Sequence, residues 1–172
     1  MGITSTAVLG GISVILLVVA SAFFSSSETA IFSLPGEWAV SQAGTDDPRA
    51  VALRNLRANP HRLLVTLLVG NNIVNIAISS VITASFARHF SPGLAVTGAT
   101  IVASSVVLVF GEIVPKSYGL SNATQWSLTV ARPLQHVEQI LYPLVLTFDG
   151  ITRGLNDQLN ADRNIEETYI DG

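Results

Sequence analysis

One carboxylate stands at the end of an apolar run that is long enough to enter a lipid bilayer. This residue is Glu112, which follows Gly111 and precedes Pro115 by three positions. If the run is helical, Pro115 has no N–H to offer the carbonyl oxygen of Gly111, and its ring crowds that carbonyl. Interrupted helices of this kind are tolerated in membranes where the backbone lines a cavity, and they commonly mark cation or substrate sites. The stretch therefore predicts an intramembrane cation site.

Two earlier apolar segments offer further oxygen atoms, each set on one face of a helix. The candidates are Ser21, Ser25 and Glu28 in the first segment, and Asn72, Asn75 and Ser79 in the second. Asparagine would be costly against lipid, so its face should turn toward other helices. Serine and asparagine often do no more than hydrogen-bond between helices, and we favour this alternative for the serines alone. For Asn72 and Asn75 together with Glu112 we favour a functional site, because an intramembrane carboxylate indicates one.

The ligand types narrow the class of ion. Hydroxyl, amide, backbone carbonyl and carboxylate oxygens are hard donors, whereas the chain has no cysteine and its single methionine is Met1. Zinc and copper are therefore poor candidates. Magnesium prefers an octahedron of oxygens at about 2.0–2.1 Å, and sodium also binds oxygen but needs less charge. The residues themselves predict a hard cation and leave Mg²⁺ and Na⁺ open.

The composition of the 172-residue chain is that of a membrane domain. Hydrophobic residues make up 49% of it and charged residues only 12%, against about 25% charged residues in an ordinary soluble domain. The net charge of −3, without basic stretches interleaved with aromatic residues, excludes nucleic acid as a partner. The histidines lie in separate segments, and there is no Ser/His/Asp set or P-loop, so we do not expect an enzyme.

Three apolar stretches predict membrane-spanning helices at residues 8–31, 63–86 and 94–110. A helix needs about 20 apolar residues to cross the hydrocarbon core. Between the first two stretches, Asp47 followed by Pro48 predicts the start of a weakly amphipathic surface helix over residues 48–59. The expected fold class is an all-α integral membrane protein with three transmembrane helices and further juxtamembrane or re-entrant helices.

The distribution of basic residues predicts the orientation. Arginines are concentrated between the first two stretches, whereas Arg88 is the only full charge between residues 63 and 111. Because basic loops stay in the cytoplasm, we expect a multi-pass protein of the cell membrane with its N-terminus outside and its C-terminal end inside. The first ten residues contain no lysine or arginine and the apolar run exceeds an h-region, so we expect this segment to stay uncleaved.

Residues 122–155 mix apolar positions with charges and prolines. We expect two half-length helices here, broken near Tyr142 and Pro143, at the interface or as a re-entrant hairpin; a full span stays open. His136 and Glu138 are two positions apart and do not share a helix face, which favours interfacial placement over metal binding. The acidic residues 156–172 predict the start of a cytoplasmic helical linker, which leaves residues 1–155 as the expected transmembrane domain.

Three segments, in order on the successive stretches, carry a resemblance to a known family. They are SAFFSSSETAIF at 21–32, GNNIVN at 70–75 and GEIVPK at 111–116. Together they resemble the transmembrane domain of the CorC/CNNM (cyclin M-like) family of magnesium transporters, and the likeness covers residues 6–155. The resemblance implies a homodimer with three membrane helices and a juxtamembrane helical belt in each subunit. It also implies efflux of Mg²⁺, with Na⁺ as the proposed counter-ion.

The resemblance also implies the site residues. Carried over position by position, the metal ligands are Ser21, Ser25, Asn72, Asn75, Gly111 and Glu112, with Glu28, Ser79 and Pro115 in support. Members of the family usually continue into a cytoplasmic, nucleotide-binding CBS-pair domain, which we expect in the full-length protein. A function of another class stays open, namely a membrane-embedded Mg²⁺ sensor or scaffold that regulates another transporter.

The dimer interface is expected on the second and third spans. Ala99 and Ala103 form a small-x-x-x-small pair on the third stretch, and such pairs let membrane helices approach closely. The prediction of a dimer depends mainly on the family resemblance.

Overall fold

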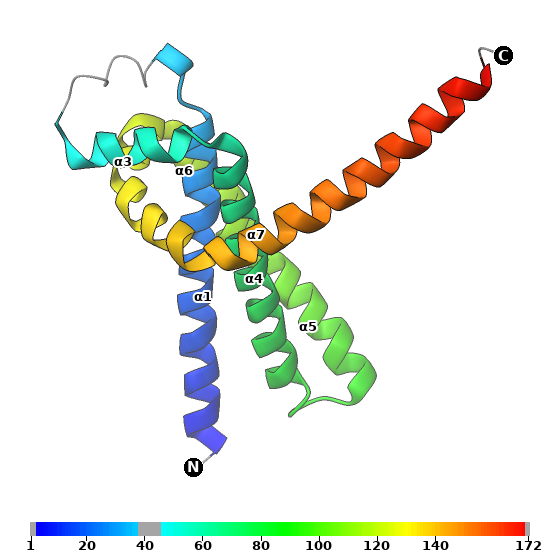
Figure 1. Ribbon diagram of the computed structural model, residues 1–172. Helices are drawn as coiled ribbons and strands as arrows, with labels where there is room; N and C mark the ends of the chain where they lie inside the picture. The colour runs from blue at the N-terminus through cyan, green and yellow to red at the C-terminus, as the bar shows by residue number, and fades with distance from the viewer. Residues whose placement is uncertain (1–2, 38–45, 171–172) are drawn as a thin grey trace.

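The computed structural model describes the backbone of residues 3–37 and 46–170, and the side chains of residues 8–37 and 46–147. Every element in these ranges is helical (Figure 1). The elements are α1 (Ile3–Phe32), α3 (Pro48–Arg57), α4 (Pro60–Phe86), α5 (Pro92–Val106), the π-helical turn η1 (Val107–Ile113), α6 (Val114–Ser121) and α7 (Ala123–Ile170). The expected all-α class is confirmed.

Three helices of the described residues are long and apolar enough to cross a membrane. They cover Val8–Phe32, Pro60–Phe86 and Pro92–Ser121, the last of which joins α5, η1 and α6. Their large apolar side chains point outward, as at Val19, Ile76 and Ile101, whereas hydroxyls such as those of Ser21 and Ser25 are buried between them. This arrangement, apolar outside and polar inside, suits a lipid environment. The three predicted spans are confirmed, and the protein is a multi-pass membrane protein.

The surface helix predicted between the first two spans is α3, and it lies across one end of the bundle (Figure 1). The side chain of Asp47 caps it by accepting a hydrogen bond from the backbone N–H of Arg49 at 2.8 Å, and Pro48 occupies the first turn, where no N–H is needed. Leu53 and Leu56 are buried in one cluster with residues of α1, α4 and α7. Each such leucine contributes roughly 1.5–3 kcal/mol relative to exposure in water.

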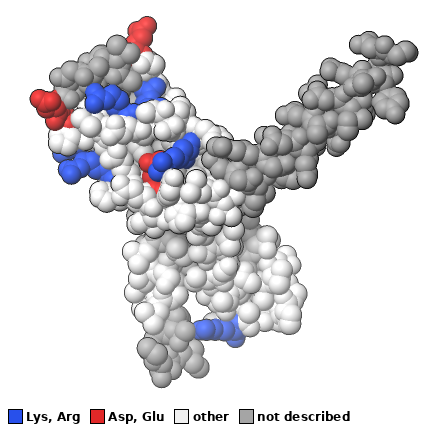
Figure 2. Space-filling model, in the orientation of Figure 1, with Lys and Arg blue, Asp and Glu red and all other residues white. Residues whose placement is uncertain are grey.

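Charged side chains gather at the end of the molecule that carries α3, whereas the opposite half is largely uncharged on the face shown in Figure 2. The arginines of α3 and of the start of α4 belong to this end, namely Arg49, Arg54, Arg57 and Arg62. The guanidinium of Arg57 donates to the backbone carbonyls of Leu34 and Pro35 at 3.1 and 3.4 Å. This contact holds α3 against the chain that leaves α1.

The two half-length helices expected over residues 122–155 are a single helix, so the predicted break near Tyr142 and Pro143 was wrong. The helix α7 runs from Ala123 to Ile170 with Pro133 and Pro143 inside it. Each proline removes one hydrogen bond and bends the helix, but contacts with α1, α3 and α4 hold the turns on either side of Pro133. Figure 1 shows α7 curving past α1 and α4 before its remainder extends away from the bundle. Among the described residues, α7 is not a candidate span.

A charged pair fixes α7 to α4 just before Pro143. The Nε atom of Arg62 lies 2.7 Å from the Oε1 atom of Glu138, and its guanidinium stands 4.5 Å over the ring of Tyr142. His136 instead contacts the carbonyl oxygen of Arg132 on its own helix at 2.8 Å. Glu138 therefore serves as the partner of an arginine. The helix continues to Ile170, the side chains of the acidic tail lie outside the described residues, and the domain boundary at 155 stays a prediction.

Small residues bring α4 and α5 together within one subunit. Ala99 and Ala103 are buried in a cluster with Ile78 and Ile82 of α4. The dimer interface was predicted partly from this pair of alanines, but within the chain the pair packs against α4. A dimer would have to use other positions on these helices.

Candidate cation site

Gly111 and Glu112 lie in a π-helical turn. In η1 the backbone N–H of Val114 donates to the carbonyl oxygen of Val109, five residues back, so the turn is wider than an α-helical one. The interruption predicted from glycine and proline is therefore a local widening, and the chain continues directly into α6. Pro115 is buried in the first turn of α6 and cannot donate to the carbonyl of Gly111. Single π-helical turns inside α-helices frequently coincide with functional sites.

The carboxylate of Glu112 contacts groups from two neighbouring segments. Its Oε1 atom accepts a hydrogen bond from the Nδ2 atom of Asn71 on α4 at 2.6 Å. Its Oε2 atom lies 3.1 Å from the ammonium nitrogen of Lys116, one turn later. The same nitrogen lies 3.5 Å from the Oε2 atom of Glu28 on α1. With 22% of its side chain exposed, Glu112 is held by these contacts at the junction of the three spans.

A second set of oxygens lies next to this carboxylate. The buried hydroxyl of Ser21 lies 2.7 Å from the Oδ1 atom of Asn75 and 3.2 Å from the Oδ1 atom of Asn71. It can donate its single proton to one of these two oxygens at a time. Gly111 faces the same hydroxyl, because a Cβ atom added there would come within 2.6 Å of the Ser21 oxygen. The absence of a side chain at Gly111 thus allows α1 and η1 to approach closely.

Ser25 places another buried hydroxyl beside the Glu112 carboxylate. It lies one turn after Ser21 on α1 and is fully buried near the Glu112 carboxylate. Its hydroxyl has no partner at ideal hydrogen-bond geometry within the described residues, and the Glu112 carboxylate is the acceptor within its reach. Buried hydroxyls are normally satisfied, since leaving one unpaired costs roughly 1–3 kcal/mol. This oxygen is available to a ligand that enters beside Glu112.

The structure brings most of the predicted ligands together but separates two residues from them. The residues that meet at the junction of α1, α4 and η1 are Ser21, Ser25, Asn75, Gly111 and Glu112. Pro115 is buried in the next turn of the chain, and Glu28 contacts the same Lys116 as Glu112 does. Asn72 and Ser79 are exposed. The Nδ2 atom of Asn72 donates to the carbonyl of Leu68 on its own helix at 2.9 Å.

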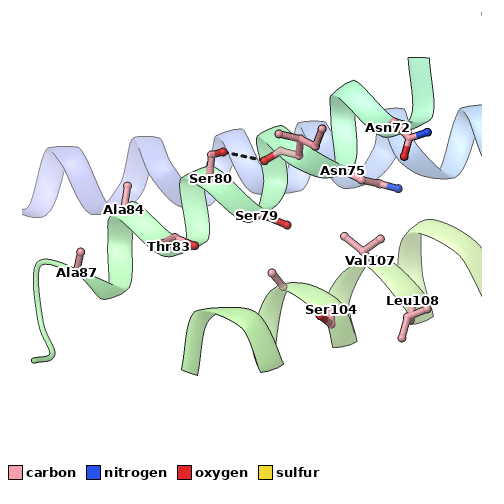
Figure 3. A pocket seen from close by; sticks show the side chains of 12 residues that line it. Asn72, Asn75, Ser79, Ser80, Thr83, Ala84, Ala87, Ser104, Val107 and Leu108 are labelled. Atoms are coloured by element: carbon pink, nitrogen blue, oxygen red, sulfur yellow. Dashed lines mark hydrogen bonds between the residues drawn. The ribbon is translucent and has the colours of Figure 1, made fainter. Parts of the chain in front are cut away.

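The two separated residues line an open groove of about 820 Å³ between α4 on one side and α5 and η1 on the other. Asn75, Ser79 and Thr83 contribute polar groups from α4, and Ser104 contributes one from α5 (Figure 3). Asn75 belongs both to this groove and to the cluster around Ser21. Polar side chains therefore continue from the cluster along α4 toward the turn between α4 and α5.

Two contacts of the carboxylate, Asn71 and Lys116, were not predicted from the sequence. Both carried a signal, because Asn71 precedes Asn75 by four positions and Lys116 follows Glu112 by four, and residues four apart share a helix face. The pair of Asn72 with Asn75, at a spacing of three, fits one face equally well. Sequence alone offered no reason to choose between the two asparagines.

The choice between Asn71 and Asn72 gives a first prediction. Replacing Asn71 with alanine removes the amide that holds Oε1 of Glu112, and we expect the affinity for Mg²⁺ to fall about tenfold, the size expected for a hydrogen bond to a charged group. Asn72→Ala should change it less than about twofold, since this amide contacts only its own helix. Isothermal titration of both variants with Mg²⁺ measures the difference. A larger loss in Asn72→Ala would show that the amide of Asn72, and not that of Asn71, acts on the ion.

Three apolar spans that enclose a set of oxygen atoms around one carboxylate define a multi-pass membrane protein with a candidate cation site. The chain belongs to the CNNM family, described as the cyclin M transmembrane N-terminal domain, whose model matches residues 12–170. The family resemblance seen in the three sequence segments is confirmed.

Relatives of this chain occur in plants and bacteria. It is 35% identical over 145 residues to a chloroplastic DUF21 domain-containing protein of Arabidopsis thaliana, covering 84% of this chain and 22% of the relative. It is 32% identical over 139 residues to a UPF0053 protein of Synechocystis, covering 81% and 40%. It is 33% identical over 146 residues to the UPF0053 inner membrane protein YfjD of Escherichia coli, covering 84% and 34%. The chain thus spans less than half the length of each of these relatives.

Proposed function

We propose that this domain binds Mg²⁺ beside Glu112 and carries it across the membrane. The observation that supports the proposal best is a charged carboxylate inside the spans with neutral oxygen atoms around it from α1, α4 and η1. An anionic group in that position is expensive unless it has a partner, and its usual role is in an ion pathway. Hydroxyl, amide and carboxylate oxygens are the ligands that hard cations prefer.

Each group has a definable role toward the ion. Glu112 supplies negative charge, while Ser21, Ser25 and Asn75 supply neutral oxygens. The carbonyl of Gly111 is a further candidate ligand, because Pro115 cannot donate to it in the α-helical pattern. One carboxylate balances half the charge of a divalent ion, which fits an ion that retains several of its water molecules, as Mg²⁺ commonly does. Na⁺ needs less charge and is the alternative cargo for the same oxygens.

The groove along α4 favours transport over sensing. Polar groups of α4 continue through this otherwise largely apolar groove from Asn75 past Ser79 and Thr83 toward the α4–α5 turn. An ion sensor would need only the closed cluster. If the concentration of arginines near α3 marks the cytoplasmic side, the groove leads toward the outside of the cell, in the direction of efflux that the family resemblance implies. The second candidate function, a Mg²⁺ sensor or scaffold, uses the same cluster without the groove.

Reconstitution distinguishes the two functions. Purified protein is placed in liposomes that contain a Mg²⁺-sensitive dye, and we expect an inward Mg²⁺ gradient to give a dye response well above that of protein-free liposomes. Binding in titration without flux in liposomes would support the sensor. If the protein shows neither Mg²⁺ binding nor Mg²⁺ flux, the proposal is wrong.

The assembly is proposed on family grounds. We expect a homodimer in the membrane and a cytoplasmic CBS-pair domain in the full-length protein, and the longer relatives are consistent with additional domains. Mass measurement in mild detergent tests the dimer, which a purely monomeric species would contradict.

A further inference from the structure

We infer that Lys116 is a tethered cation that competes with the transported ion for the carboxylate of Glu112. The inference rests on the proposed cation site and names the residue that sets its affinity. The ammonium nitrogen of Lys116 lies 3.1 Å from Oε2 of Glu112 and 3.5 Å from Oε2 of Glu28. One positive group therefore stands between two carboxylates from different helices.

Both oxygens of Glu112 already have partners in this arrangement. Asn71 donates to Oε1 and Lys116 contacts Oε2. An amide side chain can turn its own oxygen toward an ion, but an ammonium group has three donors and no acceptor, so it cannot share in binding a cation. Because its positive charge repels a cation on the same carboxylate, we expect Lys116 to move away from Glu112 when an ion binds there.

Glu28 offers the displaced ammonium group a second carboxylate. The side chains of Lys116 and Glu28 are 44% and 36% exposed, so neither is fixed by close packing, and the four-carbon stem of lysine lets its charge move. The ammonium group of Lys116 can thus move from its position between the two carboxylates to a position where it contacts Glu28 alone. The contact with Glu28 keeps the ammonium group paired throughout the exchange.

Such an exchange has a consequence for transport. Without an ammonium group beside it, the carboxylate of Glu112 would hold a divalent ion tightly. The charge of Lys116 weakens that attraction, and an ion must bind loosely enough to leave if it is to be transported. A residue with only a structural role between α1 and α6 would have the opposite effect, since its removal would loosen the site.

Removal of the positive charge tests the inference. We expect Lys116→Met to lower the Kd for Mg²⁺ about fivefold in isothermal titration, the size of a partly exposed ion pair that no longer has to be broken. Lys116→Gln should act in the same direction, while Lys116→Arg should keep a Kd close to that of the parent. Arg88→Met, which removes an exposed positive charge from the α4–α5 turn, is the matched control and should leave the Kd unchanged. Unchanged or weaker binding in both neutral Lys116 variants overturns the inference.

A double-mutant cycle tests the role of Glu28. Alone, Glu28→Gln should weaken Mg²⁺ binding, because the ammonium group then has only Glu112 to pair with. In the Lys116→Met background the same change should have a much smaller effect. An equal loss in both backgrounds would mean that Glu28 acts on the ion independently of Lys116, and the exchange would be wrong.

The two proposals fail in different ways. If the parent protein binds no Mg²⁺, or if the Glu112→Gln variant binds Mg²⁺ as well as the parent does, then both the proposed cation site and the role of Lys116 are wrong. If binding depends on Glu112 but Lys116→Met and Lys116→Gln do not tighten it, the site stands and only the role of Lys116 is overturned.

Discussion

We expect Glu112→Gln to lower the affinity for Mg²⁺ by about a hundredfold or more and to abolish flux, while the protein still folds. The substitution keeps the shape of the side chain and one carbonyl oxygen but removes the negative charge. A pair of unit charges about 4 Å apart contributes roughly 4 kcal/mol at an effective dielectric constant of about 20, and each 1.4 kcal/mol or so is a factor of ten in affinity. Isothermal titration and the liposome assay measure the two losses.

Two features of the structure make this a clean experiment. Asn71 can still donate to the remaining carbonyl oxygen, and Lys116 keeps Glu28 as a partner, so the helices retain their contacts. Glu37→Gln removes the same charge from an exposed position after α1 and serves as the control. Glu112→Gln that elutes as the parent does in size-exclusion chromatography but binds Mg²⁺ equally well would show that the carboxylate is structural.

Gly119→Ala is expected to have the largest effect on stability. Gly119 of α6 lies directly against the backbone of Ser26 on α1, and an added Cβ atom would overlap the carbonyl oxygen of Ser26. A backbone atom cannot turn aside as a side chain can, so the two helices must separate. Overpacking of this kind costs typically about 1–3 kcal/mol, which corresponds to a fall in Tm of roughly 5 °C for a chain of this size.

The separation should also reach the cation site. The indole N–H of Trp126 donates to the hydroxyl of Ser26 at 3.0 Å, and Trp126 packs edge-on against Tyr118, so α1, α6 and α7 are fastened together at this point. Moving α1 away from α6 displaces Ser25 relative to Glu112, and we expect weaker Mg²⁺ binding together with the lower Tm.

Thermal unfolding in detergent, followed by circular dichroism, measures the change. Gly11→Ala is the matched control, because a Cβ atom at Gly11 of α1 meets nothing within 4 Å and alanine favours a helix over glycine by about 1 kcal/mol. That variant should be as stable as the parent or more so. A Gly119→Ala protein with the parental Tm would show that the helices accommodate the methyl group.

The sequence by itself determined the features that depend on local chemistry. Apolar length predicted the three spans, because a helix must be about 20 residues long to cross the hydrocarbon core. Asp47 and Pro48 predicted the start of α3, because a cap and an N-terminal proline act within one turn. Glycine and proline around Glu112 predicted a backbone irregularity, and the oxygen-rich side chains predicted a hard cation.

Only the tertiary structure decided which faces meet. Successive residues on an α-helix are rotated by about 100°, so the difference between Asn71 and Asn72 is a rotation of α4 that packing alone fixes. That packing includes Gly70, which lies against the ring of Phe24 on α1. Because Gly70 faces α1, the next residue, Asn71, is oriented so that its amide contacts Glu112. The contact of Lys116 with Glu28 and the passage of α7 through Pro143 likewise depend on neighbouring helices. Local sequence contains no information on those neighbours, because the groups that supply the contacts are distant in the chain.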